Sequence, residues 1–385
     1  MRSVYITSIK KGTAPRIQTE TSSIIDELFG DAPVATDSIP NKFYRTVTKE
    51  VDTNALRAPD NYTSNVLWYK FRLNNYLAEH NVNEMYREFN IPKRTGGFRT
   101  IDAPEDDLKM FMREFSNTFL KTFKLLTHDS AFAYIKGRSV IDAVKEHQNN
   151  KSRWFLKIDL KDFFGSCNKE FIVNQLYKIY PFALGGTDTI DLLNSLADLS
   201  CLNNKLPQGT PISPWLTNLI MIEFDYKINK LLNKLANDET IKKQRYVSTR
   251  YADDIIISAK EKFDYQLVIE ELKKIFEGTP LTIKDEKTRF GSSAGRNWNL
   301  GIMYNKDNTL TIGHKKKRQI KDNIYYFIKF KDTFELEDCW WLQGNISWLK
   351  SVEPEYTEGL LTYYKNKFDI DVWQTLLDKI KSFNN

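Results

Sequence analysis

Cysteine, histidine and long apolar runs are scarce in this 385-residue chain, and each shortage excludes a class of protein. The three cysteines, at positions 167, 201 and 339, stand far apart without a C-x-x-C spacing, and the four histidines form no paired ligand motif. A zinc site is therefore not expected. An odd number of scattered thiols fits a reducing compartment.

The sequence also shows no pattern typical of a membrane span or a secretory signal. No stretch approaches the ~18 consecutive apolar residues of a membrane span, and the first residues, MRSVYITSIKKGTAPR, have no apolar core of a secretory signal. We therefore expect a cytoplasmic protein with no membrane partner. The composition itself, 41% hydrophobic and 28% charged, is typical of a globular protein.

Two features are abundant instead. The chain has 24 Phe and 19 Tyr, more aromatic surface than a core of this size needs, so some rings could stack on bases. The net charge of +6 is mild, but the basic residues cluster at 93–94, 242–243 and 315–318. Local basic clusters combined with aromatic residues indicate a nucleic-acid partner.

The length predicts two or three subdomains with an α+β sheet backed by helices. Residues 1–60 are rich in Thr, Ser and Pro and are predicted to be a loosely packed arm. The apolar spacing predicts two helices over 64–89, a β-hairpin over 91–104 and a helix over 106–123. Further along, it predicts a strand at 154–158, helices at 169–180 and 213–232, and strands at 245–251 and 255–258.

The segment RYADDIIIS, residues 250–258, places Asp253 and Asp254 directly before three isoleucines. A carboxylate in a buried strand is costly unless it is paired or bound to a cation. Asp159 closes another apolar strand, WFLKID, so three carboxylates from two strands could converge. Without His or Cys partners they would select hard cations, Mg²⁺ with Mn²⁺ as the alternative. Two such ions would activate a 3′-oxygen and stabilise leaving pyrophosphate.

Between these segments lies LPQGTPISPWLTN, residues 206–218. Its glycine and prolines predict an irregular turn, Ser213 is predicted to cap the following helix, and Pro214 suits the first helical position. The amide groups at such a helix start could bind phosphate or face a base pair.

The segments FLKIDLKDFF, LPQGTPISP and YADD, in this order, resemble the palm of reverse transcriptases, and the resemblance spans about residues 85–370. It implies a right-hand polymerase with fingers, an antiparallel palm sheet backed by helices, and a helical thumb. The implied division is an N-terminal arm at 1–60, fingers with the start of the palm at 61–150, palm at 151–300, and primer grip and thumb at 301–385. The implied activity is RNA-directed DNA polymerisation from dNTPs and a 3′-hydroxyl by two-metal catalysis.

The same resemblance implies roles for individual residues. The catalytic and metal-binding carboxylates would be Asp159, Asp253 and Asp254, and Lys287 would protonate pyrophosphate. The dNTP contacts would be Lys93, Arg94, Arg99, Gln208 and the steric gate Phe164, although Phe164 could instead be a core residue. The nucleic-acid contacts would be Lys136, Arg138, Gly209, Tyr251, Gly301 of the primer grip, Lys315, Lys316 and Lys317.

The subfamily implied is the bacterial retron-like, abortive-infection or defence-associated group. Retron enzymes carry Val-Thr-Gly near the primer grip, whereas residues 299–301 here are Asn-Leu-Gly, which favours the abortive-infection or defence-associated branch. The expected template is a structured noncoding RNA in antiphage defence. No endonuclease, maturase, RNase H or integrase segment is expected, and the oligomeric state, including a homo-oligomer, stays open.

Four alternatives remain. The chain could be a template-independent DNA polymerase of the abortive-infection type, with or without a protein hydroxyl as primer, or a catalytically silent RNA-binding scaffold. The basic run 315–318 could be a solvated helix start rather than a phosphate-tracking surface. Trp340 and Trp341 are predicted to be core residues, with a base-stacking platform as the alternative.

Overall fold

The computed structural model describes residues 3–11, 44–92, 96–238, 243–293, 300–305 and 307–383. It forms two compact units. The first comprises Met1–Ser139, Leu156–Ile257 and Asp264–Arg289, and the second comprises Val140–Phe155, Ser258–Phe263 and Phe290–Asn385.

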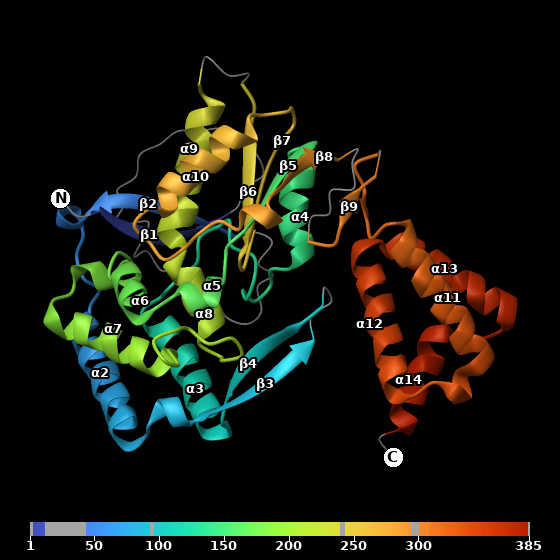
Figure 1. Cartoon of the computed structure of the whole chain (residues 1–385), viewed down its shortest axis with the longest axis horizontal. Helices are drawn as coiled ribbons and strands as arrows, with labels where there is room; N and C mark the ends of the chain where they lie inside the picture. Colours follow the sequence, from blue (N-terminus) through green and yellow to red (C-terminus); the bar gives the residue numbers. More distant parts are fainter. Residues whose placement is uncertain are drawn as a thin grey trace. The chain divides into compact units, whose positions relative to one another are not determined.

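A four-stranded sheet carries the predicted strands. Its order is β6-β7-β5-β8, with bounds β5 Trp154–Asp159, β6 Tyr246–Tyr251, β7 Asp254–Ala259 and β8 Arg289–Ser292. Ile255 to Ala259 of β7 are all buried, as expected for a run of β-branched residues in a covered strand. The two strands predicted on either side of the Asp253–Asp254 pair are therefore confirmed (Figure 1).

The first unit also contains eight of the helices that the structure describes. Their bounds are α2 Tyr62–Glu79, α3 Asp106–Thr122, α5 Phe163–Ser166, α6 Lys169–Leu176, α7 Thr187–Ser200, α8 Ser213–Ile220, α9 Ile222–Ala236 and α10 Tyr265–Phe276. Helix α9 packs against β6 and α10, and α2 packs against α7. The predicted helix at 106–123 is confirmed as α3 because Leu108, Phe115 and Phe119 recur at helical spacing and are completely buried. Burial of such side chains stabilises each by about 1.5–3 kcal/mol.

The first residues are not a loosely packed arm. Strands β1, Ser3–Lys11, and β2, Tyr44–Asp52, pair antiparallel, and Val4, Tyr5 and Ile6 are buried. The Tyr5 backbone also accepts from Tyr180 N at 3.1 Å, which joins β1 to the segment after α6. The prediction failed because the Thr- and Ser-rich composition concealed a short apolar run; residues 12–43 lie outside the described part.

The second helix predicted within 64–89 is also wrong. A short 3-10 turn, η3 Val82–Glu84, leads into strand β3, Tyr86–Pro92, which pairs antiparallel with β4, Phe98–Pro104. Phe89 lies opposite Ile101 in this ladder. The residues Met85, Tyr86 and Phe89 fit either a helical or a strand period, and the partner strand β4 decides between them.

The helix predicted over 213–232 is divided at Met221 into α8 and α9. Its start is capped differently from the prediction, because Thr210 Oγ1 accepts from Ser213 N at 3.1 Å. Ser213 itself is the first helical residue and Pro214 follows it, as expected for the first turn.

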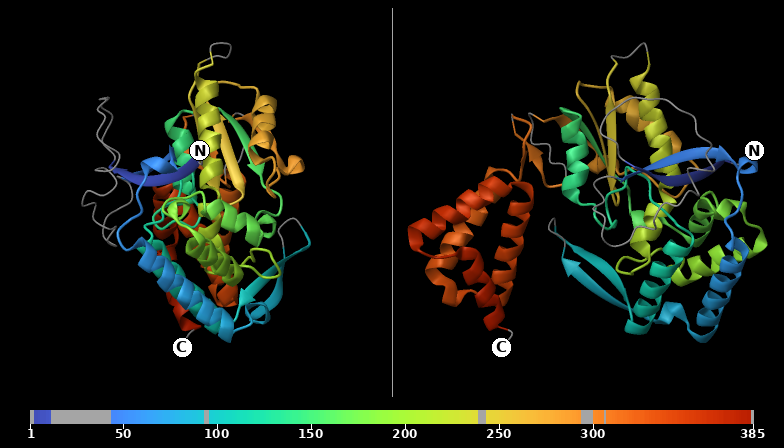
Figure 2. Two further views of the ribbon diagram at one scale, coloured as in Figure 1. Left: turned by 90° about the vertical axis from the view of Figure 1, so that its left-hand side faces the viewer. Right: turned by 180° about the vertical axis from the view of Figure 1, so that it is seen from behind.

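The second unit contains α4, Val140–Asn149, a short hairpin and a helical bundle (Figure 2). The hairpin strands are β9, Met303–Tyr304, and β10, Leu310–Thr311; the bundle helices are α11 His314–Phe330, α12 Leu336–Val352, α13 Pro354–Phe368 and α14 Val372–Ser382. The second unit also contains the 3-10 turn η6 Lys331–Thr333, whereas η2 Thr53–Ala55, η4 Phe182–Leu184 and η5 Asp285–Lys287 belong to the first unit.

The bundle buries Ile320, Ile324 and Phe327 of α11, which recur at helical spacing. The prediction that Trp340 and Trp341 are core residues is wrong, because their exposed fractions are 52% and 38%. Both lie in α12, whose neighbouring Leu342 is buried, so the helix turns these two rings outward.

The three cysteines are free and buried. Within the described ranges, no helix is long and apolar enough to cross a membrane.

Candidate active site

The three predicted carboxylates lie at the ends of neighbouring strands. Asp159 is the last residue of β5. Asp253 ends the two-residue connection from β6 to β7, and Asp254 is the first residue of β7, the strand next to β5. Leu160 N donates to Asp253 O at 3.1 Å, so the backbones meet directly at this point. Ala252 has φ +57°, which turns the chain between the two strands.

Two lysines neutralise two of these carboxylates. Lys287 Nζ donates to Asp159 Oδ1 at 2.8 Å, and Lys157 Nζ donates to Asp254 Oδ2 at 2.9 Å. Lys287 comes from η5, which Lys284 N anchors by donating to Asp159 O at 2.8 Å. The hydrogen bond with Asp159 raises the pKa of Lys287, so this ammonium group stays charged beside the carboxylate.

Asp253 has a different environment. Burial raises the pKa of its carboxyl group, and the charges of Asp254 and Asp159 raise it further, against a lowering hydrogen bond from its own backbone. A carboxylate in this position gains most from a nearby cation. The negative charge of the site is therefore concentrated where the β6–β7 turn meets the end of β5.

The donor chemistry fits a hard divalent ion, since every acidic group here offers carboxylate oxygens. The side chains as they stand do not form a ligand cluster: across the described residues, no group of three or more His, Cys, Asp or Glu is arranged to hold a metal ion. One oxygen of Asp159 and one oxygen of Asp254 each accept a hydrogen bond from a lysine. A divalent ion would therefore share these carboxylates with Lys287 and Lys157 or displace the ammonium groups.

The loop at Gln208 and Gly209 packs on the β3–β4 hairpin. Gln208 O accepts from Asp102 N at 3.2 Å. Gly209 has φ +116°, and a Cβ there would lie 2.9 Å from Ile101 Cγ2 and 3.2 Å from Asp102 O. Only glycine fits this close approach of loop and strand. The loop is thus positioned by β4, the strand that also carries Arg99.

The steric-gate candidate Phe164 lies in the short helix α5, five residues after Asp159, and is half-buried with its ring centroid 5.6 Å from that of Phe163. Tyr251 is half-buried at the end of β6.

Tyr134 was not among the predicted contacts. Burial raises the pKa of its hydroxyl, the charges of Asp253 and Tyr251 raise this pKa further, and the exposed Arg99 lowers it. Tyr134 therefore lies within electrostatic reach of the turn and of the hairpin.

The two predicted contacts in the segment after Tyr134 differ. Lys136 is exposed. Arg138 bonds within its own loop: Nη1 donates to Asp129 O at 2.8 Å and Ala131 O at 2.6 Å, and Nη2 donates to Asp129 Oδ1 at 2.9 Å. Arg138 therefore stabilises its own loop, whereas the charge of Lys136 lies at the surface.

The predicted contacts of the second unit lie before and within α11. Gly301 has φ +87° ahead of β9. Lys315 is exposed; Lys316 lies over the Trp341 ring at 4.9 Å; Lys317 Nζ donates to Glu353 Oε2 at 2.7 Å and lies 4.5 Å from the Tyr356 ring centre. Lys317 is thus tied to α13, and Lys315 and Lys316 present the basic surface.

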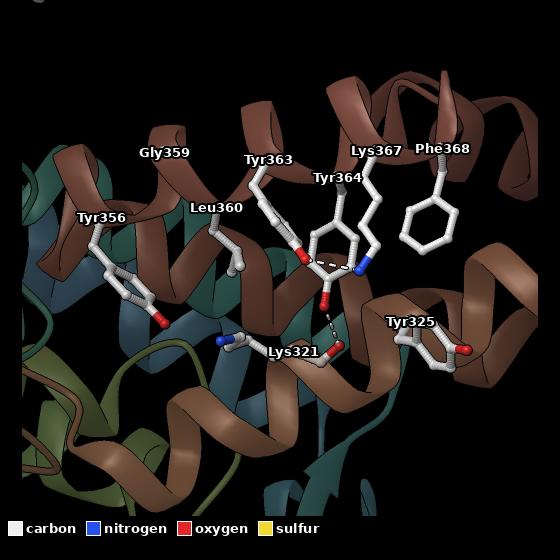
Figure 3. Close-up of a pocket in the computed structure, with 9 residues that line it drawn as sticks. All are labelled: Lys321, Tyr325, Tyr356, Gly359, Leu360, Tyr363, Tyr364, Lys367 and Phe368. Carbon is white, nitrogen blue, oxygen red and sulfur yellow. Dashed lines mark hydrogen bonds between the residues drawn. The ribbon is translucent and has the colours of Figure 1, made fainter.

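Helices α11 and α13 also frame a groove of about 430 Å³ (Figure 3). It is lined by Lys321, Tyr325, Tyr356, Gly359, Leu360, Tyr363, Tyr364, Lys367 and Phe368. Two hydrogen bonds join its lining residues: Tyr364 donates to Lys321 O at 3.1 Å, and Lys367 donates to Tyr363 Oη at 2.9 Å.

Lys93 and Arg94 lie outside the described residues, so their predicted dNTP contacts stay predictions.

Lys157 is a site residue that the sequence interpretation missed. It stands two residues before Asp159 on one strand, and alternate residues of a strand share a face. That spacing was the available signal.

A family of known proteins matches most of this chain. The sequence pattern of the family described as "Reverse transcriptase (RNA-dependent DNA polymerase)" matches residues 91–331, more than half of the chain. The chain belongs to the reverse transcriptase family. The predicted α+β reverse transcriptase fold and the enzyme class, an RNA-directed DNA polymerase, are thereby confirmed.

Bacterial retron enzymes are among the curated relatives of this reverse transcriptase. It is 29% identical over 294 residues to the Retron Ec83 reverse transcriptase of Escherichia coli, covering 72% of this chain and 86% of that one. It is 25% identical over 317 residues to the Retron Mx162 reverse transcriptase of Myxococcus xanthus, covering 76% and 61%. The retron-like assignment is supported. The narrower preference for the abortive-infection or defence-associated branch stays a prediction.

Among solved structures, the apo telomerase of Candida tropicalis matches with a TM-score of 0.43 and 13% identity, covering 77% of this chain and 61% of that one. A Candida albicans telomerase in complex with a telomeric RNA fragment matches with a TM-score of 0.42 and 11% identity, covering 76% and 54%. The chain thus spans little more than half of these telomerases.

Proposed function

We propose that this reverse transcriptase adds dNTPs to a 3′-hydroxyl on an RNA template, with Asp159, Asp253 and Asp254 as the catalytic carboxylates and Mg²⁺ as the metal. The observation that carries the proposal is the meeting of Asp159 with the Asp253–Asp254 turn at the ends of β5, β6 and β7. Two ions bound there would activate the attacking 3′-oxygen and stabilise charge on pyrophosphate.

The chain's own residues would do the remaining work. Lys287, held at Asp159 by a 2.8 Å hydrogen bond, would be released toward the leaving pyrophosphate and donate its proton. Gln208 and Gly209, whose loop packs on β4, would support the nascent base pair. Phe164 would block a 2′-hydroxyl. Positioning and charge stabilisation of this kind account for most of phosphoryl-transfer catalysis.

We propose further that the template is a structured noncoding RNA that travels with the protein. The curated relatives named as retron reverse transcriptases support a partner of this kind. The exposed Lys136 and Lys315, together with the half-buried Lys316, would contact its phosphates. A role in antiphage defence, a cytoplasmic location and a homo-oligomeric state are further hypotheses from the sequence.

The test uses the full chain with an RNA template, a DNA primer, labelled dNTPs and Mg²⁺. We expect primer extension complementary to the template in the wild type and none in an Asp253→Asn variant, whose carboxylate charge is removed at nearly constant shape. DNA that ignores the template would favour the template-independent alternative. RNA binding without any DNA synthesis would favour the scaffold alternative and refute the proposal.

A further inference from the structure

Three polar side chains of the first unit are buried together. They are Arg250 of β6, Asp225 of α9 and Asn218 of α8, with exposed fractions of 1%, 2% and 0%. Removing a guanidinium and a carboxylate from water is costly, and the attraction between them repays this only with good geometry and complete hydrogen bonding. An apolar pair could fill the same space, so the ionic cluster calls for another explanation.

The guanidinium of Arg250 uses its donors in two directions. Nε donates to Asp225 Oδ1 at 2.9 Å and to Oδ2 at 3.1 Å, and Nη2 donates to Oδ2 at 2.8 Å. This forked contact fixes the plane of the guanidinium group. Nη1 then donates to Asn218 Oδ1 at 3.1 Å and to the carbonyl oxygen of Ala252 at 3.3 Å.

The Ala252 carbonyl belongs to the peptide group that joins Ala252 to Asp253. Ala252 has φ +57°, a left-handed conformation that costs a non-glycine residue about 1 kcal/mol or more. Such a conformation persists only where neighbouring groups hold it. Arg250 is placed to hold it, and the orientation of this peptide sets the direction in which the Asp253 side chain leaves the turn.

The cluster also reaches two other segments of the site. Asn218 Nδ2 donates to Ala133 O at 2.8 Å, directly before Tyr134. The backbone of Arg250 bonds to the same segment, with its N donating to Ser130 O at 2.6 Å. Helix α8, which carries Asn218, begins four residues after Gly209. One buried cluster therefore contacts the turn, the Tyr134 segment and the helix that follows the Gln208–Gly209 loop.

We propose that Arg250, Asp225 and Asn218 form a positioning cluster that holds the Ala252–Asp253 peptide so that the Asp253 carboxylate can bind divalent ions. This inference rests on the proposed function and deepens it. A cluster that only stabilised the fold would be replaceable by apolar side chains of similar volume. A positioning cluster is not replaceable in this way, because the apolar pair has no donor for the Ala252 carbonyl.

The test compares three variants of the full chain with the wild type: Arg250→Met/Asp225→Leu, Arg250→Lys, and a matched control, Lys178→Met/Glu223→Leu. The control removes a 2.7 Å ion pair between Lys178, which follows α6, and Glu223 of α9, which is 8% exposed. Neither side chain is hydrogen-bonded to the turn in the described part of the chain. Two quantities are measured: the urea midpoint of unfolding, and primer extension across a Mg²⁺ series.

We expect the apolar double variant to unfold at or near the wild-type midpoint, but to need about tenfold more Mg²⁺ and to extend primers about 100-fold more slowly, as for a misplaced catalytic group. Arg250→Lys keeps the charge but lacks the fork. We expect Arg250→Lys to fold and to show the same shift in Mg²⁺ requirement. This variant therefore carries the test in the case that the apolar double variant does not fold. The control keeps the wild-type Mg²⁺ requirement.

A folded double variant with the wild-type rate and Mg²⁺ requirement would overturn the positioning role while leaving the proposed function intact. Unfolding of both Arg250 variants would also overturn it, since the cluster would then be needed for folding itself. No extension by the wild type would overturn the proposed function and this inference together.

Discussion

His147 makes the second unit sensitive to acid. The side chain is completely buried in α4, with Nδ1 2.6 Å from Ser258 Oγ, and burial lowers its pKa from 6.5 to about 3. As the pH falls through 6.5, the unfolded chain binds a proton at this residue while the folded chain does not. Because the folded pKa lies below the unfolded one, the stabilising contribution is present above pH 6.5 and is lost as the pH falls toward 3. From this linkage, the free energy of unfolding falls by about 2 kcal/mol between pH 8 and pH 5.

The assay is urea unfolding of the wild type and of His147→Gln at pH 8 and pH 5, followed by tryptophan fluorescence. We expect the loss of stability on acidification to be smaller in the variant by about 2 kcal/mol, whatever its stability at pH 8. His128 is also buried, and burial lowers its pKa, but it is present in both proteins and its effect cancels. Equal losses in the two proteins would refute the reasoning.

Three further predictions concern the site. Asp253→Ala or Asp254→Ala abolishes labelled dNTP incorporation while circular dichroism and RNA binding stay near wild type; synthesis by both single variants would contradict the assignment. Phe164→Ala admits ribonucleotides in a competition assay, and unchanged discrimination would make Phe164 a packing residue. Gly209→Ala places a Cβ 2.9 Å from Ile101 Cγ2 at φ +116°, which costs about 1–3 kcal/mol and raises the KM for dNTPs. The matched control Gly344→Ala meets nothing within 4 Å in helix α12 and should leave KM unchanged, so an equal KM in both would reject the clash.

Elements with one strong period were predictable from the sequence. Helix α3 presents a continuous apolar stripe, and β7 is a run of isoleucines between turn residues, so the local pattern alone decides each. The order of the three motifs was equally informative, because the family match at residues 91–331 includes all of them.

The failures share one physical cause, which is that a short segment takes the structure that its partner offers. Residues 86–92 form a strand because β4 pairs with them, and residues 3–11 form a strand because β2 pairs with them. Trp340 and Trp341 face outward because α12 buries Leu342 and Ile346 instead. None of these partners is visible in a local window.

For the site, the sequence by itself determined which residues carry charge and at which strand ends they stand, since both follow from local pattern and motif order. Only the tertiary structure decided what surrounds them: that Lys157 and Lys287 neutralise Asp254 and Asp159, and that Arg250 holds the turn through the Ala252 carbonyl. These contacts join residues up to 128 positions apart. Such pairs are set by the packing of strands and helices on one another, which no local pattern encodes.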